Sequence, residues 1–233
     1  LPSDSLRNIF SKIFIFKSTF STVSCLYLPN PSHTMTEVYE LIENTLSGNN
    51  IPANADFLQW HVRMVHADGF TLGIISDEEG KFDTSKNHWA IIIETARRDV
   101  RLSMESRMNK KTRKHGVLVL TRLSYEGKSR SVLYRETYSW KYPAVTVKEV
   151  VEFALDHGWH KYKMFTTTDG AKKGCRHHLK TMLLGFQARG WIGSKSDDGQ
   201  KIDDFLPFVY TRDEDDYNQV EVKPKSIDLG EFL

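Results

Sequence analysis

The stretch HWAIIIET, from His88 to Thr95, decides the fold class of this chain. In this stretch apolar residues occupy both the odd and the even positions, so a strand formed here would have apolar side chains on both faces. This is typical of a strand that is buried on both faces. We therefore predict that residues 88–95 form a central strand of a sheet. His88 opens this strand and shares one face with Ala90 and Ile92, because successive side chains of a strand point to opposite faces.

Further strands are predicted before and after this segment. Residues 57–66 alternate apolar and polar side chains and are predicted to form a strand. Asp68-Gly69 has the composition of a hairpin turn, so residues 70–76 are predicted to form the second, antiparallel strand of this hairpin. Arg97-Arg98-Asp99 is expected to turn the chain into the strand that follows residue 95. The later predicted strands are residues 100–104, 116–125, 131–138, 161–166 and 205–210.

Three segments carry the period of about 3.6 residues that marks an amphipathic helix. The first runs from Thr36 to Leu46 and ends before Gly48. The second begins with the capping box Thr146-x-x-Glu149, and the third runs from Cys175 to Ala188 and is followed by Gly190. Strands followed by helices predict an α+β fold, with a mostly antiparallel sheet of five to seven strands and two or three packed helices.

Length and composition favour one ordered domain. The chain has 233 residues, 39% of them hydrophobic, which is enough for a single core. We expect this domain over residues 35–212 and an acidic, loosely ordered tail over residues 213–233. Residues 1–34 are rich in Ser and Thr, which favours a disordered or spurious N-terminal extension, with a transit peptide as the alternative.

Charge and cysteine content narrow the class of protein. The net charge of +2 indicates no particular class of partner. Cys25 and Cys175 are the only cysteines, so the sequence has neither a disulfide framework nor a four-cysteine zinc site, and we expect a cytoplasmic protein. No stretch is both long and apolar enough to predict a membrane span.

Cys175 is the candidate nucleophile. It lies in the first turn of the predicted helix, where unpaired N–H groups and the helix dipole favour a thiolate and could hold an oxyanion. If this helix packs on the face of the sheet that carries His88, the imidazole could accept the thiol proton, as in nucleophilic catalysis. The alternative is that Cys175 only packs in the core, as free cysteine usually does.

A resemblance supports this pair of residues. The run 87–92 (NHWAII) resembles the H-W-A-I-Y strand of the lecithin:retinol acyltransferase-like, circularly permuted papain-like cysteine enzymes. The run 174–178 (GCRHH) is similar to the segment of that group in which the catalytic cysteine opens a helix. The resemblance implies a permuted papain-like fold, with Cys175 as nucleophile and His88 as base, and thioester chemistry on acyl or peptide carbonyls.

Some positions differ from the residues found in that group, and for other roles the sequence offers several candidates. Gly174 stands where the group has asparagine, and Arg176 stands where it has an acid. The residue that orients the base has no clear match. The candidates for that role are Ser103, Glu105 and His115, and the candidates on the substrate or oxyanion side are Trp89, Arg176 and His177.

A second resemblance covers residues 57–192. The pairs and triplets His88-Trp89, Gly174-Cys175-Arg176 and Arg189-Gly190-Trp191 resemble a family of uncharacterised fungal proteins with an H-W strand and a G-C-R helix start. This resemblance implies one shared domain and carries no activity with it.

The basic run 107–114 is the only candidate for binding nucleic acid. Its cations are Arg107, Lys110, Lys111, Arg113 and Lys114, but no aromatic side chain lies between them to stack on bases. A solvated hairpin loop is therefore the favoured interpretation, and nucleic acid is not the expected partner.

No cofactor or metal is predicted, because the chain has no phosphate-binding loop, and adjacent histidines such as His177 and His178 point in different directions on a helix.

The predicted function is a cysteine-dependent hydrolase or acyltransferase that acts on an unknown carbonyl substrate, either a small molecule or an acyl or peptide group. The alternative is a non-catalytic domain that binds a ligand or another protein.

Overall fold

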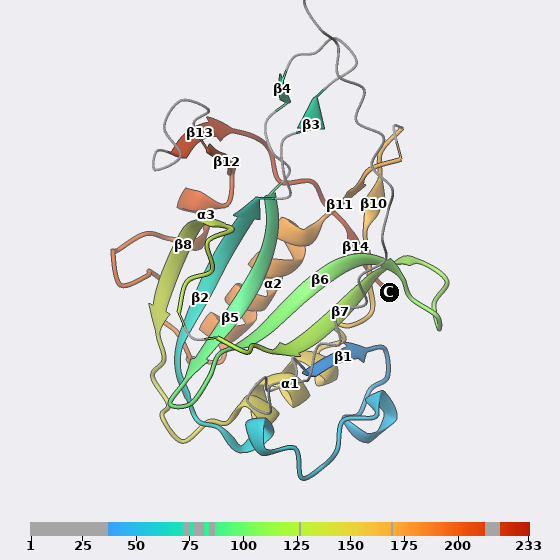
Figure 1. Cartoon of the computed structure of the whole chain (residues 1–233), viewed down its shortest axis with the longest axis vertical. Helices are drawn as coiled ribbons and strands as arrows, with labels where there is room; N and C mark the ends of the chain where they lie inside the picture. The colour runs from blue at the N-terminus through green and yellow to red at the C-terminus, as the bar shows by residue number, and fades with distance from the viewer. Residues whose placement is uncertain are drawn as a thin grey trace, which may run out of the picture. The chain divides into compact units, whose positions relative to one another are not determined.

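A six-stranded antiparallel sheet is the main element of the computed structural model, which describes residues 37–71, 75–76, 82–83, 87–125, 127–168, 170–212 and 220–233. The order of its strands is β1-β7-β6-β5-β2-β8 (Figure 1). The bounds of these strands are β1 Glu37–Leu41, β2 Val62–Thr71, β5 Asn87–Thr95, β6 Val100–Met108, β7 His115–Arg122 and β8 Val132–Ser139.

Helices and short strand pairs surround the sheet. The helices are α1 Val147–Asp156, α2 Cys175–Ala188 and α3 Ile202–Phe205, with two 3-10 helices, η1 Ser47–Asn49 and η2 Asp56–Gln59. The short pairs are β3 Ile75–Ser76 with β4 Phe82–Asp83, β10 Phe165–Thr166 with β11 Lys172–Lys173, β12 Phe208–Arg212 with β13 Val220–Pro224, and β9 Tyr162–Lys163 with β14 Glu231–Phe232. The predicted α+β class is confirmed. Within the described ranges, none of the helices combines the length and the apolar character needed to cross a membrane.

The predicted central strand is β5, one of the two innermost strands of the sheet. Its neighbours are β2 and β6, with Ile91 opposite Ala67 on one side and opposite Leu102 on the other. Ile91 and Ile92 point to opposite faces, and both are buried. The run of apolar residues is therefore explained by burial on both faces.

One face of the sheet, which we call the helix face, packs against α1 and α2 (Figure 1). The helices turn an amphipathic stripe toward the strands, as their sequence period predicts. Members of this core are Trp89, Ile91 and Ile93 from β5, Val150, Val151 and Ala154 from α1, and Leu179, Met182, Leu183 and Phe186 from α2.

The opposite face, which we call the far face, has a much smaller apolar cluster. In Figure 1 the connection between β7 and β8 crosses in front of this face. The cluster consists of Phe70, Ala90, Ile92, Leu123 and Val132.

Buried charge occupies part of the far face. Arg135 donates to both carboxylate oxygens of Asp68, at 2.7 and 2.6 Å. Next to this pair, Nε2 of His66 donates to Glu94 at 3.1 Å, and the Thr137 hydroxyl lies 2.9 Å from its Nδ1. Asp68 and His66 are both buried. Paired hydrogen bonds of this kind offset the cost of removing charged groups from water.

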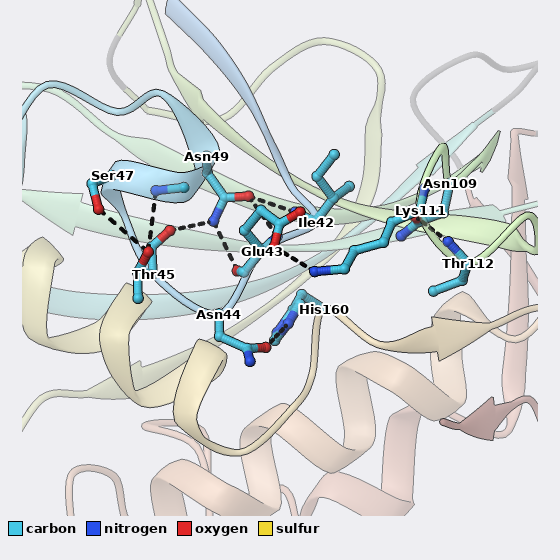
Figure 2. Close-up of polar contacts among 11 residues, drawn as sticks. Ile42, Glu43, Asn44, Thr45, Ser47, Asn49, Asn109, Lys111, Thr112 and His160 are labelled. Carbon is cyan, nitrogen blue, oxygen red and sulfur yellow. Dashed lines mark hydrogen bonds and ion pairs between the residues drawn. The ribbon is translucent and has the colours of Figure 1, made fainter.

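The prediction of a helix over residues 36–46 is wrong. Residues 37–41 form β1, which pairs with β7, so tertiary backbone pairing overrides a short helical pattern. The side chain of Asn49 ends the strand in a turn, as Figure 2 shows. It accepts from the N–H groups of Ile42 and Glu43 and donates to the carbonyls of Glu43 and Thr45, at 2.6–2.9 Å.

The predicted hairpin at Asp68-Gly69 is also wrong, because β2 continues through both residues. The carboxylate of Asp68 is used in the pair with Arg135. Gly69 lies under the indole of Trp89, and a Cβ atom at this position would come 3.1 Å from that ring. The two residues therefore serve packing on the two faces and not a turn.

Two further boundaries differ from the sequence analysis. Residues 56–59, at the start of the first predicted strand, form η2. Phe205 ends α3, and β12 begins only at Phe208, so the last predicted strand starts later than expected. The predicted Thr146–Glu149 capping box is confirmed, since the Thr146 N–H donates to Glu149 at 2.7 Å and the Glu149 N–H donates back at 3.4 Å.

The predicted domain boundaries lie near the two ends of the chain. The predictions for residues 1–34, including Cys25, lie outside the described residues, as do residues 213–219 of the predicted tail. Residues 220–233 contain β13, which pairs with β12, and β14, which pairs with β9. The division of the chain into domains stays a prediction.

Candidate functional site

A cavity of about 220 Å³ lies where α2 begins. It is lined by the first turn of α2, the start of β5, the end of β6, β11 and the segment that follows β13. The polar residues of its wall that matter below are His88, Glu105, Lys172, Cys175, Lys225 and Asp228. An engineered apolar cavity of about 150 Å³ holds benzene, so the space here admits a somewhat larger organic molecule.

Two contacts fix the walls of this cavity. The side-chain amide of Asn87 donates to the Tyr210 carbonyl and accepts from the Tyr210 N–H, both at 2.7 Å, which ties the start of β5 to β12. The hydroxyl of Tyr162 donates to the carbonyl of Gly174, just before α2, at 2.9 Å. Gly174 has a φ of +127°, and a Cβ atom there would come 2.8 Å from that hydroxyl, so glycine suits this position.

Cys175 lies in the cavity wall and is half-buried. Its thiol donates to the carbonyl oxygen of Asn87 at an Sγ–O distance of 3.8 Å. Burial raises the pKa of the Cys175 thiol and outweighs the Trp89 N–H and the charge of Arg176, which lower it. The environment therefore favours the neutral thiol, whereas the position at a helix start was expected to favour the thiolate.

His88 also lines the cavity, but its side chain belongs to the far face. Its ring lies beside Phe70, with 6.3 Å between the ring centroids, and α2 covers the opposite face of β5. The condition for the predicted pair, that α2 packs on the face of His88, is therefore not met. No hydrogen bond between Cys175 and His88 is found in the described part of the chain.

The imidazole of His88 faces Glu105 instead. Its Nε2 atom lies 3.6 Å from Oε1 of Glu105, is buried and has no hydrogen-bond partner within the described ranges. Burial lowers the pKa of His88, and the nearby carboxylate of Glu105 raises it by less. The ring is therefore neutral at pH 7.

Of the three candidates for orienting the base, Glu105 is the one that the structure brings to His88. Ser103 contacts Glu105, since its hydroxyl donates to Oε1 of Glu105 at 2.8 Å. His115 is used elsewhere, because its Nδ1 donates to the carbonyl of Ser106 at 3.0 Å. The result is a chain of contacts from Ser103 through Glu105 to His88.

The three substrate-side candidates have different surroundings. Trp89 is buried in the core of the helix face, and its Nε1 has no hydrogen-bond partner in the part of the chain that the structure describes. The N–H of Gly230 donates to Nδ1 of His177 at 3.4 Å, and the Tyr162 hydroxyl lies 3.0 Å from the same atom. Of the three, only Arg176 is part of the cavity wall.

The guanidinium of Arg176 holds the C-terminal segment against α2. It donates to backbone carbonyls only, namely those of Leu206, Phe208, Lys225 and Ser226, at 2.9–3.5 Å. Arg176 is buried, and no carboxylate forms an ion pair with it among the residues that the structure describes. Its positive charge acts on the cavity together with the carboxylate of Asp228, which lies in the same wall and interacts with it electrostatically.

Several cavity residues were missed in the sequence. Lys225 and Asp228 come from residues 213–233, which were expected to be a loosely ordered tail, and Met104, Met164 and Val209 form apolar wall. No signal in the sequence connects these positions, because they come together only through strand pairing. Lys172 and Lys173, from β11, add positive charge to the wall.

The basic run 107–114 contains the β6–β7 turn, as the favoured interpretation expected. Arg107 forms an ion pair with Glu40 at 3.3 Å, and Lys111 forms one with Glu43 (Figure 2). Two of its five cations are thus paired with carboxylates of the chain itself, and nucleic-acid binding by this loop gains no support.

No curated protein and no solved structure matches the chain. One family matches residues 73–233, more than half of the chain, and its description is "Domain of unknown function (DUF7770)". The matched range begins after β2 and includes every residue of the cavity wall named above. The chain therefore belongs to this family, DUF7770.

Proposed function

We propose that this chain is a non-catalytic ligand-binding domain, and that a small molecule binds in the cavity at the start of α2. The observation that carries the proposal is the state of Cys175. Its thiol donates to the carbonyl of Asn87 and its pKa is raised by burial, whereas a catalytic nucleophile needs a lowered pKa or an adjacent base. Cys175 is then a wall residue of the binding site.

Alkylation of Cys175 with iodoacetamide at increasing pH tests this proposal, with the modified peptide identified by mass spectrometry. We expect slow reaction that accelerates only above the free-thiol pKa of about 8.5, because the thiolate is the reactive form. The variant His88→Ala should behave in the same way. Fast alkylation near pH 6, reduced by His88→Ala, would contradict the proposal and support catalysis.

A blocking variant tests the location of the ligand. Ser106 is exposed and lines the cavity, so Ser106→Trp should fill its mouth with little effect on the core. Arg107→Trp, at the next residue and outside the cavity wall, is the matched control. Small molecules that bind the wild-type chain in ligand-observed NMR should lose binding in Ser106→Trp and keep it in Arg107→Trp.

The cysteine-dependent hydrolase or acyltransferase is the second candidate. The observation in its favour is that Cys175, His88 and Glu105 line one cavity, with Ser103 hydrogen-bonded to Glu105. In this mechanism Cys175 attacks a carbonyl carbon, His88 takes the thiol proton and returns it to the leaving group, and the N–H of Cys175 stabilises the oxyanion. A side-chain rearrangement that brings the imidazole to the sulfur is required first.

A further inference from the structure

We infer that the ligand of this cavity is a small organic anion that also carries a hydrogen-bond donor, such as an ammonium or hydroxyl group. The inference rests on the proposed function, since it names the class of molecule that the cavity would bind. It follows from the distribution of charge in the cavity wall, which has a cationic side and an acceptor side.

Cations outnumber carboxylates in the wall. The cationic residues are Lys172, Lys173, Arg176 and Lys225, and the carboxylates are Glu105 and Asp228. One pair is internally compensated, because Lys173 lies 3.7 Å from Asp228. Complementary charge is what orients a ligand in such a site, so an anionic group is expected on the cationic side.

Among the residues that the structure describes, the other three cations form no ion pair with a carboxylate. Lys172 donates to the hydroxyl of Thr166 at 3.0 Å, and Arg176 is bound to backbone carbonyls only. For Lys225, no ion pair of its ammonium group occurs within the described ranges. The cap of α2 at Gly174 makes no side-chain hydrogen bond either, so the first N–H groups of the helix add to the positive potential.

The acceptor side is formed by the carboxylate of Glu105, beside His88. Ser103 occupies one position on the carboxylate of Glu105, and His88 lies 3.6 Å away, beyond hydrogen-bond distance. The Nε2 atom of His88 is buried and has no hydrogen-bond partner among the residues that the structure describes, so it does not use the acceptor capacity of Glu105. A donor group on the ligand would bind the carboxylate, and the apolar wall of Met104 and Met164 would cover the carbon chain between the two ends.

Matched alkyl compounds test the inference by ligand-observed NMR on the full chain. The series are alkanoates from propanoate to hexanoate, the ω-amino and ω-hydroxy acids of the same lengths, and the corresponding alkylamines, alcohols and alkyl phosphates. We expect the acids to bind, with ω-amino and ω-hydroxy acids about tenfold tighter than the plain alkanoates, because their terminal group adds a charge-assisted hydrogen bond to Glu105. The alkyl phosphates show whether the anionic group is a phosphate or a carboxylate.

Single substitutions separate the two sides of the cavity. Lys225→Met should weaken all acids about tenfold, and Lys195→Met, an exposed lysine outside the cavity wall, should not. Glu105→Gln should remove the preference for ω-amino acids over alkanoates. Binding of amines or alcohols in preference to acids, lost in Ser106→Trp, would overturn this inference and leave the binding function standing. Absence of binding by every series would overturn both.

Discussion

The two faces of the six-stranded sheet are built in different ways, although they share the same strands. The helix face packs Trp89, Ile91 and Ile93 against two amphipathic helices in one large apolar core. On the far face, Ala90 and Ile92 belong to a cluster of five apolar residues, beside buried charges such as Asp68. Alternate residues of one strand thus lie in an apolar core and in a mixed, partly ionic layer.

This difference explains why Cys175 and His88 contact different partners. Cys175 packs beside the core of the helix face, whereas His88 lies beside Phe70 on the far face and faces Glu105. Both residues reach one cavity only because it lies at the ends of β5 and β6, where the sheet no longer separates the two sides. The faces of the sheet therefore decide which residues meet, and three substitution experiments probe them.

The largest effect is expected from Arg135→Met on the far face. This variant leaves Asp68 buried without its partner, which costs about 3–5 kcal/mol of the free energy of unfolding. The double variant Asp68→Leu/Arg135→Met should lose less, because no unpaired charge remains. Urea unfolding measures both. Equal losses in the single and double variants would show that the pair contributes packing and not charge compensation.

Substitutions of two neighbouring isoleucines in β5 allow the stabilities contributed by the two apolar clusters to be compared directly. Ile91→Ala removes side-chain volume from the large core of the helix face, and we expect a loss of about 4 kcal/mol. Ile92→Ala acts on the small cluster of the far face, which can relax more easily, and we expect about 2 kcal/mol. The same urea titrations give both values. A larger loss at Ile92 would reverse the order that we assign to the two faces.

The smallest effect concerns buried histidines and pH. Burial lowers the pKa of His178, beside the helix core, to about 4, and it lowers the pKa of His66 on the far face. Because each folded-state pKa lies below the unfolded value of about 6.5, the unfolded chain binds more protons in this range, and stability is lost as the pH falls from about 6.5 toward the folded value.

Each such histidine contributes at most about 1.4 kcal/mol per pH unit in that window. His178→Gln and His66→Gln should each flatten the dependence of the unfolding free energy on pH between 7 and 4.5, as measured by urea titration at several pH values. Lys195→Met, which changes no buried histidine, should keep the wild-type slope. A slope that is unchanged in both histidine variants would show that other groups set the acid sensitivity.

Local patterns in the sequence predicted much of the fold. The apolar run of residues 88–95 gave a central strand, the Thr146–Glu149 box gave the start of α1, and the stripe from Cys175 gave α2, because each depends on neighbours within a few residues. The same reasoning failed for residues 36–46 and for Asp68-Gly69. In both places the deciding partner is a distant strand, β7 for the first and β5 for the second.

The candidate site likewise combines features that follow from the local sequence with features that depend on the tertiary structure. The sequence by itself determined that Cys175 opens a helix and that His88 opens a buried strand, since both follow from local periodicity. Only the tertiary structure decided which face α2 covers, that Glu105 meets His88, and that Lys225 and Asp228 complete the cavity. Periodicity fixes which side chains share a face of one element, but the face on which another element packs depends on the fit of whole surfaces that are far apart in the chain.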